Sequence, residues 1–207
     1  MKSVFAALII LFCGTANAFA QKKSRQVTVK AWVRDSLPPV SDTLTDIQRV
    51  DMIYLYVLKA KNYRKGRTLF ACMRATLRHN YIPTLGLRIP LTLENTPSFR
   101  RRIKKLPGAL FADNTGSRDS DKLQHFFASA WLAYFTNDPQ FADLVGIAVE
   151  RGEDLIVTSD IYDERDIRAN RLGQQFAIQL RKNPHALPGD LFRAWNDDYN
   201  KNSTRTK

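Results

Sequence analysis

Apolar residues recur every three to four positions along most of this chain, which is the spacing of amphipathic helices. In residues 44–61 the apolar positions are Ile47, Val50, Ile53, Tyr54, Val57 and Leu58. The same spacing, interrupted by proline, glycine and asparagine, predicts further helices. The six expected helices span residues 44–61, 66–79, 121–135, 140–157, 163–182 and 188–199. We therefore expect a mainly α protein, built as a single-domain helical bundle.

Other segments depart from the helical spacing. Residues 26–33 alternate apolar and polar side chains, which predicts a short extended N-terminal arm or strand. Residues 81–97 are rich in proline and β-branched side chains, so we expect them to be irregular or extended. The polar tail, residues 201–207, is expected to be disordered. The single domain would then occupy residues 21–200.

The N-terminus has the pattern of a secretory signal peptide. Lys2 precedes an apolar stretch at residues 4–12, and Ala18 and Ala20 fit the small-x-small rule for cleavage. We expect cleavage after Ala20, which removes residues 1–20, with cleavage after Ala18 as the alternative. An uncleaved anchor is disfavoured because the apolar stretch is shorter than the roughly 20 residues that a membrane span needs.

The two cysteines do not predict a disulfide. Cys13 lies in the expected signal peptide, and Phe12 before it does not suit a lipidation site. Removal of the signal peptide leaves Cys72 alone, so no intramolecular disulfide can form. Cys72 lies beside Phe70 and Met73 in an expected helix, which favours a small core residue over a nucleophile.

The formal net charge is +12, which in a cytosolic chain would favour nucleic-acid binding. The export signal argues against nucleic acid and favours an anionic envelope surface, such as lipid head groups or lipopolysaccharide. A solvated basic face that serves solubility is the alternative. A dense run of positive charge comprises Arg100, Arg101, Arg102, Lys104 and Lys105. This run could bind phosphates and attach the protein to anionic membranes in a salt-sensitive way, or form one or two exposed helical turns.

Polar residues at helical spacing interrupt the apolar pattern of three consecutive expected helices. They are Asp121, Lys122, His125 and Ser129, then Gly146, Glu150, Glu153 and Asp154, then Asp166, Asn170 and Gly173. The glycines would let another backbone approach closely. Since buried carboxylates are costly unless they are paired, we expect these three stripes to converge on one polar cluster inside the bundle.

This cluster could serve in one of three ways. A catalytic site would use His125, Glu150 and Asp166. In it, His125 with Glu150 would activate water while Lys122 and Asn170 stabilise negative charge. A divalent metal could instead bind to the oxygen and imidazole donors. That set is Asp121, His125, Glu150 and Asp166.

The third use is binding, or a buried hydrogen-bond network that joins the helices, without chemistry. The residues assigned to binding are Asp121, Lys122, Ser129, Glu153 and Asn170, together with Arg100, Arg101 and Arg102. The sequence identifies neither a metal nor another cofactor.

The same residues resemble the motifs of a family of small exported bacterial proteins of unknown function, described as periplasmic lipoproteins. Residues 121–130, DKLQHFFASA, are similar to its DKxxHFxxSA motif. Its GxxxExxE and DxxxNxxG motifs match Gly146, Glu150 and Glu153, and Asp166, Asn170 and Gly173. A weaker similarity connects these motifs to VanZ-like membrane proteins. The resemblance covers residues 121–180 and implies no established reaction.

This chain departs from both groups, because it lacks a lipidation motif and carries charges such as Arg151, Arg168 and Arg171 that argue against membrane spans. We expect a periplasmic or secreted envelope protein with a ligand-binding, partner-binding or structural role and no transmembrane span in the mature chain. The alternative is a hydrolase of envelope lipids or glycans that uses His125 and Glu150, with or without a metal.

Overall fold

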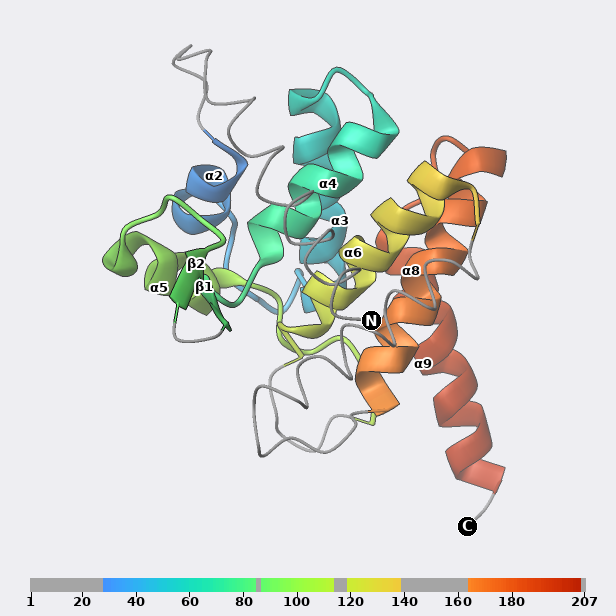
Figure 1. Cartoon of the computed structure of the whole chain (residues 1–207). Coiled ribbons are helices and arrows are strands. Elements are labelled where there is room, and N and C mark those ends of the chain that lie inside the picture. Colours follow the sequence, from blue (N-terminus) through green and yellow to red (C-terminus); the bar gives the residue numbers. More distant parts are fainter. Residues whose placement is uncertain (1–27, 85–86, 114–118, 139–163, 206–207) are drawn as a thin grey trace.

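The computed structural model describes residues 28–84, 87–113, 119–138 and 164–205 (Figure 1). The helices are α2 (Val29–Asp35), α3 (Asp46–Ala60), α4 (Lys65–Thr76), α5 (Thr96–Lys105), α6 (Lys122–Thr136), α8 (Glu164–Lys182) and α9 (Pro188–Arg205). The strands β1 (Tyr81–Thr84) and β2 (Leu87–Pro90) form an antiparallel hairpin. The prediction of a mainly α protein is confirmed.

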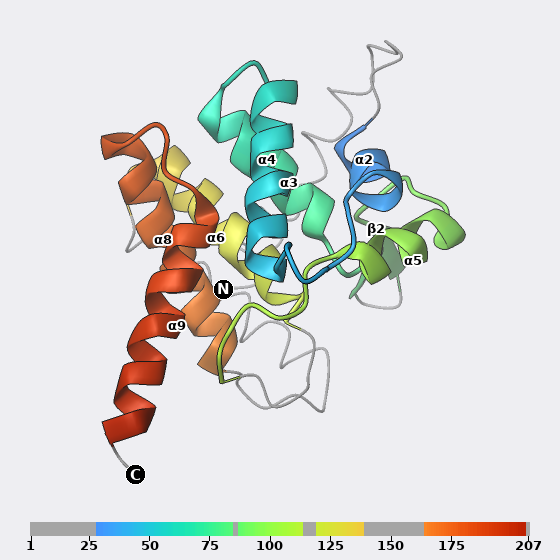
Figure 2. The ribbon, with the colours of Figure 1, turned by 180° about the vertical axis from the view of Figure 1, so that it is seen from behind.

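The helices form a bundle with the hairpin at one side. In Figure 1, α3 and α4 lie between two groups, with α6, α8 and α9 on one side and α2, α5 and the hairpin on the other. The view from behind shows α9 passing α8 and projecting beyond the bundle (Figure 2). The core of the bundle includes Tyr54, Phe126, Phe176 and Phe192, which are at most 1% exposed. The Phe126 ring lies 5.6 Å from Phe176 and 4.9 Å from Phe192, so it joins α6 to both α8 and α9.

Five of the six predicted helices are present, and local hydrogen bonds explain the starts of α3 and α6. Helix α3 begins at a capping box, in which Thr45 and Gln48 each accept a hydrogen bond from the other's backbone N–H. Helix α6 begins after Asp121, whose carboxylate accepts from the Lys122 N–H, and ends at Asn137 with φ 58°. The sixth predicted helix, residues 140–157, lies outside the described residues.

The predicted extended arm at residues 26–33 is wrong for the part that the structure describes, because Val29–Asp35 is helix α2. The Thr28 side chain caps this helix by accepting a hydrogen bond from the Ala31 N–H at 3.2 Å. Trp32 stacks on Tyr56 of α3 at 4.1 Å, and Val33 is fully buried. Tertiary packing therefore decides a segment whose short apolar pattern suits both a strand and a helix.

The predicted disordered tail begins too early, because α9 continues to Arg205. The hydroxyl groups of Ser203 and Thr204 donate to the Asn200 carbonyl at 3.1 Å, and Lys201 lies 3.9 Å from Asp198. These local contacts extend the helix without burying it. Residues 206–207 lie outside the described residues.

Cys72 is fully buried, and burial raises the pKa of its thiol, so the prediction of a core residue is confirmed. None of the described helices is both long and apolar enough to cross a membrane. The expected signal peptide, residues 1–20, lies outside the part of the chain that the structure describes.

Candidate functional site

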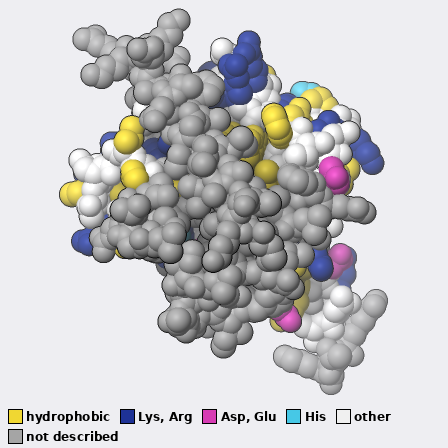
Figure 3. Space-filling view, viewed as in Figure 1, with side chains coloured by type: hydrophobic (Ala, Val, Ile, Leu, Met, Phe, Trp, Pro, Cys, Tyr) yellow, Lys and Arg dark blue, Asp and Glu magenta, His cyan; other side chains and the backbone are white. Residues whose placement is uncertain are grey.

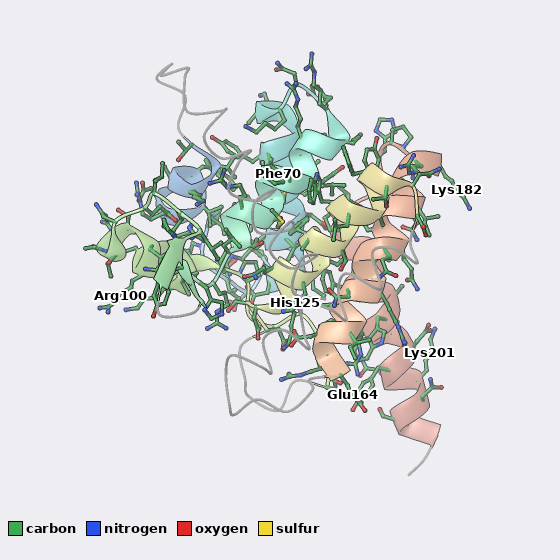
Figure 4. The ribbon with its side chains drawn as sticks, viewed as in Figure 1. Phe70, Arg100, His125, Glu164, Lys182 and Lys201 are labelled. Atoms are coloured by element: carbon green, nitrogen blue, oxygen red, sulfur yellow. The ribbon has the colours of Figure 1, made fainter. Side chains whose placement is uncertain are left out.

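The predicted polar stripes of α6 and α8 meet near the start of both helices. Figure 4 shows His125 at this end of α6 and Glu164 at the neighbouring end of α8. The Lys122 Nζ lies 2.7 Å from Asp166 Oδ1 and 3.2 Å from Asp121 Oδ2. The Lys122 side chain is only 3% exposed, so its ammonium is stable there because two carboxylates surround it.

His125 lies one turn along α6 and shares the same carboxylate. Its Nε2 is 3.5 Å from Asp166 Oδ1, and its side chain is 16% exposed. Asp166 therefore faces both the Lys122 ammonium and the His125 imidazole, with the ammonium closer. A carboxylate in contact with an imidazole can fix the orientation of the ring, but this carboxylate is also the main counter-ion of a buried lysine.

The same two stripes meet again one turn further along both helices, at Ser129 of α6 and Asn170 of α8. The Ser129 hydroxyl donates to Asn170 Oδ1 at 2.8 Å, and both residues are buried. Next to this pair, a Cβ atom added to Gly173 would lie 2.2 Å from the Phe126 carbonyl oxygen. Only glycine allows the two backbones to approach so closely. The expected convergence of the α6 and α8 stripes is therefore present.

Three ion pairs beside this cluster were missed by the sequence analysis. Asp119 is fully buried, accepts hydrogen bonds from the backbone N–H groups of Leu110 and Phe111, and lies 3.0 Å from Arg165 Nη1. The other two pairs are Asp113 with Arg168 and Asp121 with Arg78. Their partners are far apart in sequence and follow no helical period, so no sequence pattern marks them.

The second motif helix was predicted to complete this cluster. Gly146, Glu150, Glu153 and Asp154 all lie outside the described residues. Among the residues that are described, no group of three or more histidine, cysteine, aspartate or glutamate side chains could hold a metal ion. A surface pocket lined by residues that include Val40, Ile47 and Arg193 contains none of the predicted site residues.

The predicted anion site in α5 is wrong for Arg102. This side chain is fully buried, where it pairs with Glu94 at 2.8 Å and donates to the carbonyl groups of Ala75 and Leu77. Its guanidinium therefore holds α5 to the end of α4. Arg100 and Arg101 are exposed, and Arg100 lies at the edge of the molecule, apart from His125 near its middle (Figure 4).

A half-buried lysine, Lys30, lies beside the Arg102–Glu94 pair. Lys30 Nζ donates to Thr92 Oγ1 at 2.5 Å and lies 3.8 Å from Glu94. Burial lowers the pKa of Lys30 from 10.5 to about 8, although Glu94 opposes this shift. Burial alone would raise the pKa of Glu94, but the hydrogen bonds and charge of Arg102 bring it below its ordinary value.

No protein-family model, no curated protein and no solved structure matches the chain. The resemblance of residues 121–180 to exported bacterial proteins therefore stays a prediction.

We predict that Gly173→Ala destabilises the protein by about 2–3 kcal/mol, because the added methyl group meets the backbone of α6 and forces the helices apart. Urea unfolding measures this. Gly66→Ala is the matched control, since its Cβ would lie 3.6 Å from the Tyr134 ring, an ordinary contact. The control should be neutral or stabilising by up to about 1 kcal/mol. Equal stability of the two variants would contradict the close approach.

We predict that Lys122→Ala destabilises the protein by about 3 kcal/mol, because Asp166 loses its nearest cation in a shielded position. The double variant Lys122→Met with Asp166→Leu should be within about 1 kcal/mol of the wild type, since an apolar pair needs no counter-ion. Lys201→Ala is the control, because that lysine is 71% exposed and its pair should contribute nothing measurable. A double variant as unstable as the single one would contradict a structural ion pair.

We predict that wild-type stability rises relative to Lys30→Met between pH 8 and pH 10.5. Above pH 8 the folded Lys30 has released a proton that the unfolded chain still binds, so deprotonation favours folding. The gain should be on the order of 2–3 kcal/mol, measured by urea unfolding at a series of pH values. Lys59→Met, at an exposed position, should show no such trend. A pH-independent difference for Lys30→Met would refute the lowered pKa.

Proposed function

We propose that this chain is an exported cell-envelope protein that binds an anionic envelope surface and performs no chemistry at the α6–α8 cluster. The observation that supports this proposal is the separation of charge between interior and surface. Each described carboxylate that is shielded from solvent pairs with a cation. The pairs are Asp46–Arg49, Asp51–Arg193, Glu94–Arg102, Asp113–Arg168, Asp119–Arg165 and Asp166–Lys122.

Pairing in the interior leaves an excess of positive charge on the surface. The net charge is +12, and exposed lysine and arginine side chains occur on α3, α4, α5, α8 and α9. Such a surface attracts anionic head groups and phosphates. The expected signal peptide would bring the protein to an envelope where anionic lipids and lipopolysaccharide are abundant.

The closed geometry of the cluster favours a structural role. Lys122 is 3% exposed, Asp166 14% and His125 16%, and each contacts another member of the cluster. A general base needs access to a reacting proton, whereas this arrangement directs the Asp166 carboxylate toward Lys122. The groups of the cluster therefore favour joining α6 to α8 over activating water.

Hydrolysis of envelope lipids or glycans is the second candidate function. It is favoured by the contact between His125 Nε2 and Asp166 Oδ1 at 3.5 Å, because a carboxylate can orient an imidazole that acts as a base. This candidate requires that a folded Asp166→Asn variant loses a hydrolytic activity that the wild type possesses.

The proposed function predicts salt-sensitive binding to anionic vesicles. The purified protein should co-sediment with phosphatidylglycerol vesicles and not with phosphatidylcholine vesicles, because only the former attract its surface cations. Binding should weaken at least about ten-fold between about 0.01 M and 1 M salt, as the Debye length falls from about 30 Å to 3 Å.

The double variant Lys122→Met with Asp166→Leu separates the structural role of the α6–α8 cluster from binding to the anionic surface. The folded double variant should bind phosphatidylglycerol vesicles as the wild type does, because the cluster is internal. Loss of vesicle binding by the folded variant would show that the cluster takes part in binding. Absence of wild-type binding at low salt would refute the proposed function itself.

A further inference from the structure

Three segments that are distant in sequence meet at one end of the bundle. They are the turn from α3 to α4, the last turn of α6 and the turn from α8 to α9 (Figure 1). Lys65 Nζ donates to the Pro184 carbonyl at 2.5 Å. Arg181 donates to the Tyr134 carbonyl, and its guanidinium lies 4.7 Å from the centre of the Tyr134 ring. These contacts join the three segments into one continuous surface.

This surface, called the basic end below, has a dense set of cations. They are Lys59, Lys61, Arg64, Arg67, Arg181 and Lys182, all exposed except Lys61, which is half-buried. Within the described residues, none of these six forms an ion pair with a carboxylate, in contrast to the shielded cations of the interior. Figure 3 shows lysine and arginine side chains gathered over the α3–α4 turn and along the neighbouring edge.

The sequence around the basic end is free of acidic residues over long stretches. No aspartate or glutamate occurs between Asp51 and Glu94, or between Asp166 and Asp190. Asp190 is itself paired with Arg193 at 2.7 Å. After the last turn of α6, the first acidic residue along the chain is Asp138. Among the described residues, the positive charge of the basic end is thus largely uncompensated.

Two large aromatic side chains project from the same end. Tyr63 is 67% exposed and Phe135 is 74% exposed. Tyr63 has a φ of 59°, a left-handed conformation that is unfavourable for a bulky residue. Phe135 stacks on Trp131 at 5.9 Å, and Trp131 contacts Phe70 of α4 at 5.2 Å. Packing on α6 therefore supports an aromatic ring that remains open to solvent.

Two of these cations, Arg64 and Arg67, lie at the start of α4, where positive charge disfavours the helix. Helix α4 starts after Arg64, which makes no side-chain capping hydrogen bond, and its first turn contains no acidic residue. Positive charge at a helix N-terminus opposes the helix dipole. An uncapped start, like charges and a left-handed tyrosine thus coincide in one turn. Such local conflicts are expected at functional positions, where stability alone does not explain the sequence.

We propose that the basic end is the surface on which this protein docks to an anionic phospholipid bilayer. This inference rests on the proposed function and assigns its binding to particular residues. The cations would contact lipid phosphates, while Tyr63 and Phe135 enter the interfacial region between head groups and acyl chains. Lysine and arginine suit this role because their aliphatic stems cover apolar surface while their charged ends reach phosphate.

The aromatic groups favour a bilayer over a nucleic acid. Two rings that point outward among cations can enter a deformable lipid interface. The expected export signal also places the protein away from nucleic acid. A double-stranded oligonucleotide is therefore the competing ligand to include in the test.

The test is a charge reversal of the basic end in the full purified chain. The variant carries Lys59→Glu, Lys61→Glu, Arg64→Glu and Arg67→Glu, and its binding to phosphatidylglycerol vesicles is measured by co-sedimentation at low salt. Each cation near an anionic membrane contributes appreciably to binding, so we expect at least about a 100-fold loss. Circular dichroism melting verifies that the variant is folded.

The matched control reverses four exposed cations elsewhere, with the same change in net charge. It carries Arg100→Glu, Arg101→Glu, Lys104→Glu and Lys201→Glu on α5 and α9. We expect a loss of about ten-fold or less, from long-range attraction alone.

If the control loses as much binding as the basic-end variant while the wild type binds, the docking surface is wrong and the proposed function survives. If the wild type binds no vesicles, both proposals fail. Tighter binding to the oligonucleotide than to the vesicles would also overturn the bilayer assignment.

A second variant tests the aromatic groups without changing charge. Tyr63→Asn with Phe135→Asn should abolish the binding that remains at about 1 M salt, because apolar insertion is not screened. The variant should stay folded, since asparagine tolerates the left-handed conformation at position 63 better than tyrosine does. Unchanged binding at high salt would contradict a role for these two rings.

Discussion

Helices α6 and α8 pack so closely that a Cβ atom at Gly173 would lie 2.2 Å from the Phe126 carbonyl oxygen. This short separation is what lets a side chain as small as Ser129 reach Asn170 at 2.8 Å. It also places Phe126 against the rings of α8 and α9, at the centre of the core. The polar contacts and the aromatic core therefore depend on the same absence of a side chain at Gly173.

The buried charges place a second constraint on the fold. Lys122 and Arg102 lie in the interior, where Lys122 pairs with Asp166. Arg102 pairs with Glu94 and donates to two carbonyl oxygens. Replacing such pairs with apolar residues need not reduce stability, so their value lies in fixing which segments meet. Arg102 joins α5 to the end of α4, and Lys122 joins the beginnings of α6 and α8. Interior pairing of this kind also leaves the surface strongly cationic.

Helical spacing predicted the α6 and α8 faces well, because period alone decides which side chains share a face. Lys122, His125 and Asp166 were expected to meet, and the structure brings them together. The spacing could not predict the partners of Asp119 or Glu94, since these pairs join loops to helices across long sequence separations. The spacing also could not predict the secondary structure of residues 29–33, because this short segment fits both a helix and a strand pattern. The segment is helical, and Trp32 stacks on Tyr56 of α3. The roles assigned to Glu150 and Glu153 stay predictions.

The distribution of charge along α8 and α4 separates stability from function. Helix α8 has Glu164 and Asp166 in its first turn and Arg181 and Lys182 in its last, which is the order that the helix dipole favours. Its cations at the basic end therefore have a sufficient structural explanation. Helix α4 has the opposite arrangement, with cations and no acid at its start, where each disfavours the helix by about 0.3–1 kcal/mol. Lys59, in the last turn of α3, is also placed as the dipole favours. The helix dipole therefore does not explain the charges of Arg64 and Arg67 at the start of α4, and the docking proposal depends most on these two residues.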